Sequence, residues 1–236
     1  MYRESLGIIG GFGAYATLDF YRNILEAFAS ECERNYPHIY MDNDFTMPSR
    51  TKALLYGDGY DEIVEMIAAS MRKLDSLGAD HIVMACGTAH YFLPNVFKLV
   101  PEVKEKVINI IEVLKDKLLM EKVDHVLVIA AEGTLKQSLY AGYLDGINCT
   151  NPSEEYYNEI RYFIEAVKQN NMHTDVGERF LVFLDKFQCR DVVLGCTEFP
   201  VLVNLLGESE VGEELAKYRF WDPLVFVIEL LKEKMK

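Results

Sequence analysis

The chain has 236 residues, of which 50% are hydrophobic and 26% are charged, and this is an ordinary globular composition. Its formal net charge of −13 argues against a nucleic-acid-binding protein, because proteins that track phosphates need a basic face. An anionic small substrate stays open, since such a substrate responds to the local field of a pocket more than to the total charge.

The N-terminal residues lead directly into an apolar segment, without the long apolar stretch and cleavage site of a signal peptide. No run of ~18 apolar residues occurs, so we expect no membrane span and a cytoplasmic protein. The five cysteines are odd in number and have no C-x-x-C spacing, which argues against a disulfide framework or a structural zinc site. We therefore expect no metal, and free thiols at Cys32, Cys86, Cys149, Cys189 and Cys196.

In the first half of the chain, short β-branched apolar runs alternate with longer amphipathic segments. We expect strands at residues 6–10, 38–42 and 81–85, helices at 14–32 and 58–77, and a loop through 47–50. Residues 107–111 fit either a short strand or a helix, because an apolar run of this length is compatible with both.

The second half repeats this alternation. We expect strands at residues 125–130 and 191–194, and helices at 135–143, 153–169, 174–187 and 223–234. Residues 220–223 should form a strand end and helix start that dock the C-terminus on the first lobe. Strands that alternate with helices predict an α/β fold with parallel sheets flanked by helices on both faces.

Residues 80–88 and 191–197 resemble each other. Each segment has an acidic lead-in, a hydrophobic strand, a small residue, a cysteine and a threonine just beyond it. Residues 7–11 and 126–133 match more loosely as the opening strand and turn of each half. We predict two pseudo-symmetric α/β lobes, residues 1–98 plus 212–236 and residues 99–211, with the active site in the cleft between them.

The two matched cysteines are Cys86 and Cys196, and each follows a predicted strand. Ligands of parallel α/β sheets bind beyond the carboxyl ends of the strands. A cysteine at a strand-to-helix junction is close to free helix N–H groups, which favour the thiolate. Two such thiols facing one cleft could invert a stereocentre, one removing a proton and the other delivering a proton to the opposite face.

These residues resemble the aspartate/glutamate racemase family over nearly the whole chain. Residues 10–17 are similar to the family's G-G-M-G-P-x-A-T start, with Phe12 and Ala14 as departures, and residues 43–51 are similar to its N-x-x-x-x-P-x-R-T loop. The cysteine segments are similar to its C-N-T and G-C-T-E motifs, and Glu198 in the second resembles the aspartate racemase branch. The resemblance implies a homodimer that racemises aspartate or glutamate with Cys86 and Cys196 and without pyridoxal phosphate or another cofactor.

The resemblance also implies the substrate-binding residues. Arg50 of the loop motif would grip a carboxylate with its planar fork, and Lys168 would add a point charge for the second acid group. Threonine hydroxyls and backbone N–H groups near the two cysteines, and the turn after the strand at residues 125–130, would bind the α-carboxylate and stabilise the charge that develops in the transition state. The candidate binding residues are Gly11, Arg50, Gly87, Thr88, Thr134, Lys168 and Thr197.

Gly87 stands where the family has an asparagine after the first cysteine. Three consequences are open: room for a different substrate, replacement of the amide by backbone groups, or weakened activity. His90 follows the same motif, and we interpret it as a structural residue of a first helical turn, outside the catalytic pair.

Three other functions are compatible with parts of the sequence. The first is an NAD(P)-binding oxidoreductase, for which the pattern Gly11-x-Gly13-x-x-Ala16 after a strand and Asp42 at the end of the next strand are typical. This function would leave both cysteine motifs unexplained. Gly87 is compatible with a non-catalytic protein that binds an acidic amino acid. Another reaction on the same scaffold, such as hydantoin racemisation, isomerisation or decarboxylation, is the third.

Overall fold

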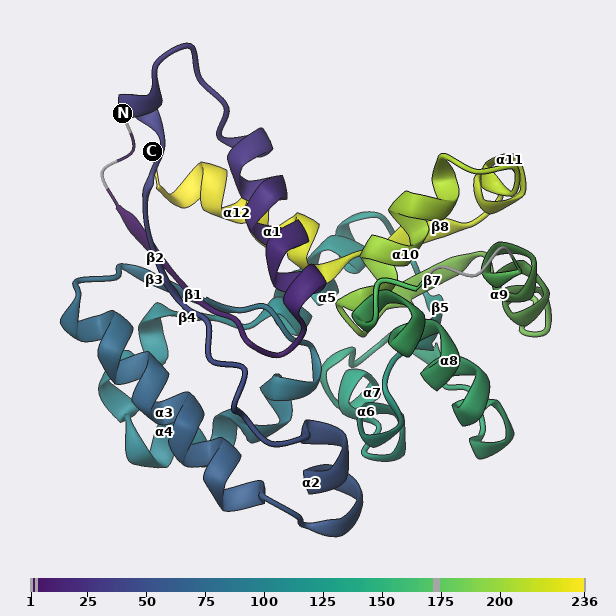
Figure 1. Ribbon diagram of the computed structural model, residues 1–236, viewed down its shortest axis with the longest axis horizontal. Helices are drawn as coiled ribbons and strands as arrows, with labels where there is room; N and C mark the ends of the chain where they lie inside the picture. Colours follow the sequence, from purple (N-terminus) through teal and green to yellow (C-terminus); the bar gives the residue numbers. More distant parts are fainter. Residues whose placement is uncertain (1, 3, 172–174, 236) are drawn as a thin grey trace.

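The computed structural model describes residues 2, 4–171 and 175–235 and contains two parallel β-sheets with helices packed on their faces (Figure 1). The strands are β1 (Ser5–Ile9), β2 (His38–Asp42), β3 (His81–Met84), β4 (Val107–Ile108), β5 (His125–Ile129), β6 (Asn148–Thr150), β7 (Asp191–Leu194) and β8 (Arg219–Trp221). The helices are α1 (Ala14–Ala27), α2 (Arg50–Tyr56), α3 (Tyr60–Ser76), α4 (Leu93–Leu99), α5 (Ile110–Met120), α6 (Glu132–Lys136), α7 (Leu139–Tyr143), α8 (Tyr157–Lys168), α9 (Val176–Asp185), α10 (Glu198–Gly207), α11 (Gly212–Leu215) and α12 (Pro223–Lys234).

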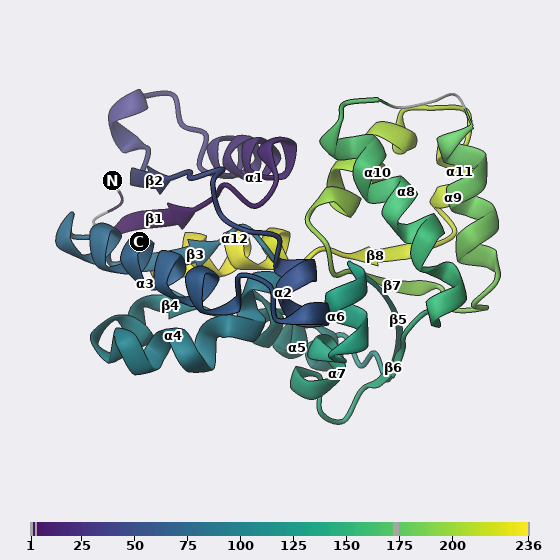
Figure 2. The same ribbon diagram turned by 60° about the horizontal axis from the view of Figure 1, so that its bottom comes forward.

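The two sheets share one topology. Their strand orders are β2-β1-β3-β4 and β6-β5-β7-β8, and every neighbouring pair is parallel. Figure 2 shows the two lobes side by side, with α2 of the first and α6 of the second meeting between them. The predicted α/β fold with two pseudo-symmetric lobes is confirmed.

Both faces of the central strands β1 and β3 are buried, which is why these strands are nearly continuous apolar runs, whereas the edge strand β2 is partly exposed. Side chains alternate between the faces: Leu6 and Ile8 of β1 join the core formed with α1, α5 and α12, whereas Ile9 joins the core formed with α3 and α4. Figure 1 shows α1 and α12 on the side of this sheet opposite α3 and α4.

Several predicted helices have different bounds in the structure. The helix predicted for residues 14–32 ends at Ala27, and beyond it Ser30 accepts hydrogen bonds from the Cys32 amide and the Asn35 side chain in a local turn. The helix predicted for 135–143 is interrupted at Ser138, whose φ of 50° separates α6 from α7. Thr174, the predicted start of a later helix, lies outside the described residues.

Sheet membership shows where the chain passes between the lobes. The first sheet extends beyond residue 98 to include β4, and β8, which follows residue 212, belongs to the second sheet. The chain then returns, since α12 packs on α1 and α5 as predicted for the C-terminal segment.

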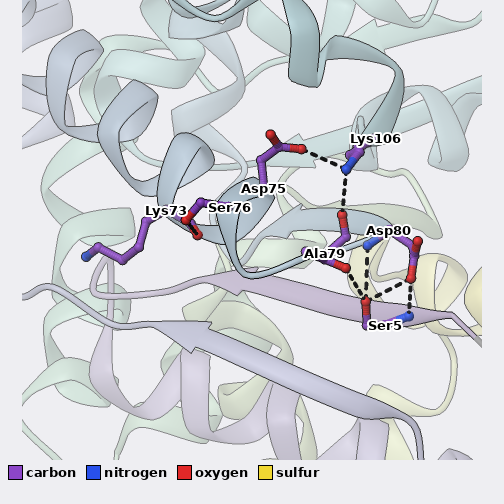
Figure 3. Close-up of polar contacts among 8 residues, drawn as sticks. Ser5, Lys73, Asp75, Ser76, Ala79, Asp80 and Lys106 are labelled. Atoms are coloured by element: carbon purple, nitrogen blue, oxygen red, sulfur yellow. Dashed lines mark hydrogen bonds and ion pairs between the residues drawn. The ribbon is translucent and has the colours of Figure 1, made fainter.

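A polar cluster joins the amino ends of β1 and β3, the ends opposite the cysteine loop. Figure 3 shows Ser5, whose amide donates to Asp80 Oδ2 at 2.8 Å and whose hydroxyl lies 2.8 Å from the same oxygen. These two hydrogen bonds lower the pKa of the Asp80 carboxyl. Nearby, Lys106 Nζ donates to Asp75 Oδ1 at 2.7 Å and to the Ala79 carbonyl at 3.1 Å.

Among the described residues, no helix combines the length and hydropathy needed to cross a membrane.

Candidate active site

Cys86 and Cys196 occupy equivalent positions in the two lobes. The residue before each cysteine extends its strand by one hydrogen bond, from the Ala85 amide to the Ile9 carbonyl (3.0 Å) and from the Gly195 amide to the Ile129 carbonyl (2.8 Å). Each thiol thus follows directly after the carboxyl end of a central strand. The Cys86 residue is 8% exposed, and Cys196 is half-buried.

Both cysteines line one cavity of about 400 Å³ between the lobes. The first lobe contributes residues of the β1–α1 turn, α2 and the Cys86 loop, and the second contributes residues of α6, α8 and the Cys196 loop. The lining residues are Phe12, Ser49, Arg50, Thr51, Lys52, Leu55, Tyr56, Cys86, Thr88, Ala131, Glu132, Ile160, Arg161, Ile164, Glu165, Lys168, Cys196, Thr197 and Glu198. Cys32, Cys149 and Cys189 do not belong to this set.

Arg50 lies at the first position of α2, a helix capped by the Ser49 side chain. Its guanidinium donates to the Phe12 carbonyl at 2.6 Å and to the Pro48 carbonyl at 3.0 Å, and lies 5.2 Å from the centre of the Phe12 ring. These contacts fix the cation in the cavity wall without neutralising its charge, because both acceptors are uncharged.

Lys168 contributes a cation from the other lobe, at the end of α8. Its Nζ is 3.9 Å from Glu165 Oε1, a long ion pair on the same helix face. The two cations predicted from the sequence, Arg50 and Lys168, therefore line the cavity from opposite lobes.

The three candidate threonines are close to the cysteine loops but differ in access. Thr88 and Thr197 line the cavity, whereas Thr134 is buried behind it with its hydroxyl 2.7 Å from that of Thr88. The Thr197 hydroxyl is directed to the Ala85 carbonyl at 3.5 Å. Thr134 is thus placed to orient Thr88.

The glycines of the first turn are required by contacts within the protein. Gly11 has a φ of 82°, and a Cβ there would collide with the backbone carbonyl of Asp44. A Cβ on Gly13 would collide with the carboxylate of Glu198. Neither glycine is among the described residues that line the cavity, whereas Phe12 between them is.

Glu198 is a site residue that the sequence indicated only as a branch marker. It is 4% exposed, and the Cys196 thiol donates a hydrogen bond to its Oε2 at 2.9 Å. The signal available from the sequence was its place two residues after the cysteine, at the first position of α10.

The thiol pKa values differ from the sequence-based expectation of a stabilised thiolate. Burial raises the pKa of Cys86, and the positive charge of Arg50 opposes this rise. Burial and the negative charge of Glu198 raise the pKa of Cys196 well above its ordinary value. Burial is therefore the largest influence on both thiols, and it acts against the thiolate that the sequence predicts. The opposing charge of Arg50 leaves the pKa of Cys86 less strongly raised than that of Cys196.

His90 is fully buried and holds the backbone of the first cysteine. Its Nδ1 donates to the Cys86 carbonyl at 2.9 Å, and its Nε2 accepts from the Ile110 amide at 3.3 Å. Burial lowers its pKa to about 4, so the ring is neutral near pH 7. Its interpretation as a structural residue agrees with these contacts.

Four further charged residues of the lining were not identified from the sequence: Lys52, Glu132, Arg161 and Glu165. Arg161 forms an ion pair with Glu132 across the α6–α8 contact. The spacing of Arg161, Glu165 and Lys168 places them on one face of α8 and was the available signal.

The sequence is similar to known amino-acid racemases. A family model described as "Asp/Glu/Hydantoin racemase" matches residues 9–215. The broad specificity amino-acid racemase RacX of Bacillus subtilis is 21% identical over 217 residues, which cover 87% of this chain and 90% of that protein. The glutamate racemase of Methylococcus capsulatus is 29% identical over 160 residues, 66% of this chain and 58% of that protein.

Among solved structures, the aspartate racemase of Picrophilus torridus superposes with a TM-score of 0.79 at 24% identity, over 98% of this chain and 94% of that one. The two-lobe fold is therefore shared, and the family and relatives support amino-acid racemisation. The chain belongs to the Asp/Glu/hydantoin racemase family.

Proposed function

We propose that the protein racemises an acidic amino acid, aspartate or glutamate, by a two-base reaction of Cys86 and Cys196. The supporting observation is that these two thiols extend from equivalent strand ends of the two lobes and line the same cavity. A substrate Cα held between them would have one thiol on each face.

The reaction transfers one proton on each face of the substrate. The thiolate of one cysteine takes the Cα proton, and the electron pair of that C–H bond is delocalised into the α-carboxylate. The thiol of the other cysteine then gives its proton to the opposite face, so the pair ends with thiol and thiolate exchanged. No electron transfer is involved, and the atoms balance without a cofactor.

The charges of the cavity favour an anionic substrate. Four cationic side chains, Arg50, Lys52, Arg161 and Lys168, line it together with three carboxylates. We propose that Arg50 and Lys168 bind the two carboxylates of the substrate from opposite lobes. The hydroxyls of Thr88, oriented by Thr134, and Thr197 would stabilise charge that develops on the α-carboxylate. Relatives named as aspartate, glutamate and broad specificity racemases support this class of substrate.

The test is incubation of purified, pyridoxal-free protein with single enantiomers in heavy water, followed by chiral chromatography and mass spectrometry. We expect inversion of aspartate or glutamate with uptake of one deuterium at Cα, and much slower inversion of asparagine and glutamine, which have the same shape without the side-chain charge. Equal rates for the acids and their amides would contradict the proposed substrate class.

Serine variants test the mechanism. Cys86→Ser and Cys196→Ser should each abolish inversion, because a hydroxyl is a far weaker acid than a thiol. Cys149→Ser, a half-buried cysteine outside the cavity, is the matched control and should keep wild-type turnover. Full turnover in either of the first two variants would remove the mechanism. We further propose a homodimer, to be checked by light scattering of the same samples.

A further inference from the structure

Tyr140 lies where the two cysteine loops meet. It belongs to α7 of the second lobe, and its side chain is fully buried, with the residue 1% exposed. Its hydroxyl donates to the carbonyl of Gly195, the residue before Cys196, at 3.2 Å. The mechanism proposed above assigns it no role.

The same hydroxyl reaches the other cysteine loop. A Cβ on Gly87, the residue after Cys86, would lie 2.6 Å from the Tyr140 hydroxyl and 2.5 Å from the Gly195 carbonyl oxygen. A Cβ on Gly195 would lie 2.9 Å from the Tyr140 ring. Both cysteines therefore have a glycine neighbour at the point where the tyrosine packs, and any larger residue at either position would displace it.

The backbone turn before α7 and the packing of this helix place the tyrosine. The chain turns at Ser138, in the left-handed region with φ 50°, so that α7 begins directly after α6 and packs against α5. Burial raises the pKa of Tyr140, and negative charge on Cys196 or Cys86 raises it further, so the hydroxyl keeps its proton and stays a donor.

We infer that Tyr140 is a positioning residue that sets the separation of the two cysteine loops, and that Gly87 is glycine because this arrangement leaves no space for a side chain. The inference rests on the proposed two-thiol reaction, which needs both sulfurs placed on opposite sides of one carbon. The inference also argues against one consequence left open for Gly87, namely room for a different substrate, because the space beside Cys86 is occupied by Tyr140 and by the Gly195 backbone.

The first test is Tyr140→Phe, which keeps the ring and removes the hydroxyl. We expect kcat to fall about tenfold with KM changed less than about twofold, because the lost hydrogen bond loosens the Cys196 loop without touching the substrate. Tyr143→Phe, on the same helix and only half-buried, is the matched control and should keep both parameters.

A second readout does not depend on turnover. Alkylation by iodoacetamide, mapped by peptide mass spectrometry, reports the reactivity of each thiol. In Tyr140→Phe the ratio of Cys196 to Cys86 alkylation rates should change several-fold, while the rates of Cys149 and Cys189 stay as in the wild type. An unchanged ratio together with unchanged kcat would overturn the inference, because simple packing is preserved by phenylalanine.

The Gly87→Ala change tests the shared contact. Alone it should lower kcat at least as strongly as Tyr140→Phe. In the double variant, removal of the hydroxyl relieves one of the two collisions, so the loss of activity should be smaller than the product of the single effects. Strictly multiplicative effects would overturn the inference.

The outcomes separate this inference from the proposed function. If the wild-type protein racemises acidic amino acids and Tyr140→Phe alters neither kcat nor the alkylation ratio, only the role of Tyr140 fails. If the wild type shows no racemisation but the alkylation ratio responds to Tyr140→Phe, the proposed function fails and the positioning of the two loops by Tyr140 stands.

Discussion

At the scale of single residues, the two thiols are chemically unequal. Cys196 donates to the buried carboxylate of Glu198, whereas the strongest charge acting on Cys86 is the guanidinium of Arg50. A neighbouring negative charge disfavours a thiolate and a positive charge favours it. Both thiols have a raised pKa, and Cys86 is therefore the one of the two that loses its proton more readily.

Glu198→Gln tests this inequality. Loss of the carboxylate charge should lower the Cys196 pKa, so the pH dependence of its alkylation should shift to lower pH while that of Cys86 moves less. Glu208→Gln at the exposed end of α10 is the control and should leave both profiles unchanged. A Cys196 profile that stays in place would show that burial alone sets its acidity.

At the scale of elements, the cap of α12 links pH to stability. The Asp222 side chain accepts from the Leu224 amide at 2.9 Å. Burial, together with the negative charge of Asp19, raises the pKa of the Asp222 carboxyl to about 7. A carboxyl with a raised pKa holds more protons in the folded than in the unfolded state, so its contribution to the free energy of unfolding decreases as pH rises from about 4 to about 7.

Asp222→Asn should therefore raise the melting temperature at pH 8 and change it little at pH 4, because asparagine keeps the cap and has no charge. Thermal unfolding at both pH values measures this. Asp222→Ala separates the two effects, since it removes the cap and the charge together. A lower melting temperature of the asparagine variant at pH 8 would contradict the prediction.

The strands that carry the site could be predicted from the sequence, whereas several connecting elements could not. After their first residues, His81 and Asp191, β3 and β7 are buried apolar runs, and each is followed by its cysteine. In contrast, β6 contains Asn148 and Thr150 at the sheet edge, and α2 is a single short helix inside a motif that resembled a loop. Such elements depend on tertiary contacts more than on local pattern.

The site was predictable in its residue types but not in its electrostatics. Both cysteines and the cations Arg50 and Lys168 do line one cavity. The raised thiol pKa values arise from burial, and the placement of Tyr140 arises from a non-glycine residue with positive φ at Ser138, neither of which can be read from linear spacing.

At the scale of the whole molecule, the lobes share one hydrophobic core. A single cluster of buried residues continues from Leu6, Ile8 and Phe20 of the first lobe to Phe163, Phe180 and Phe183 of the second. α5 and α12, which pack on each other, are part of it. The lobes should consequently unfold together, in one calorimetric transition.

Phe183→Ala tests this coupling. It removes a fully buried ring and should cost about 3–5 kcal/mol of stability, moving the whole transition to lower temperature. Val182→Ala, at a neighbouring position that is 60% exposed, should have a small effect. Two separate transitions, with only one displaced by Phe183→Ala, would show that the lobes are thermodynamically independent.

The inequality of Cys86 and Cys196 has a thermodynamic consequence for a racemase. Mirror-image amino acids have equal free energies in water, so the equilibrium constant is one and kcat/KM must be identical in the two directions. Glu198 beside only one sulfur can therefore never make the enzyme prefer one product. It can only make one enantiomer bind more tightly and turn over correspondingly more slowly than the other.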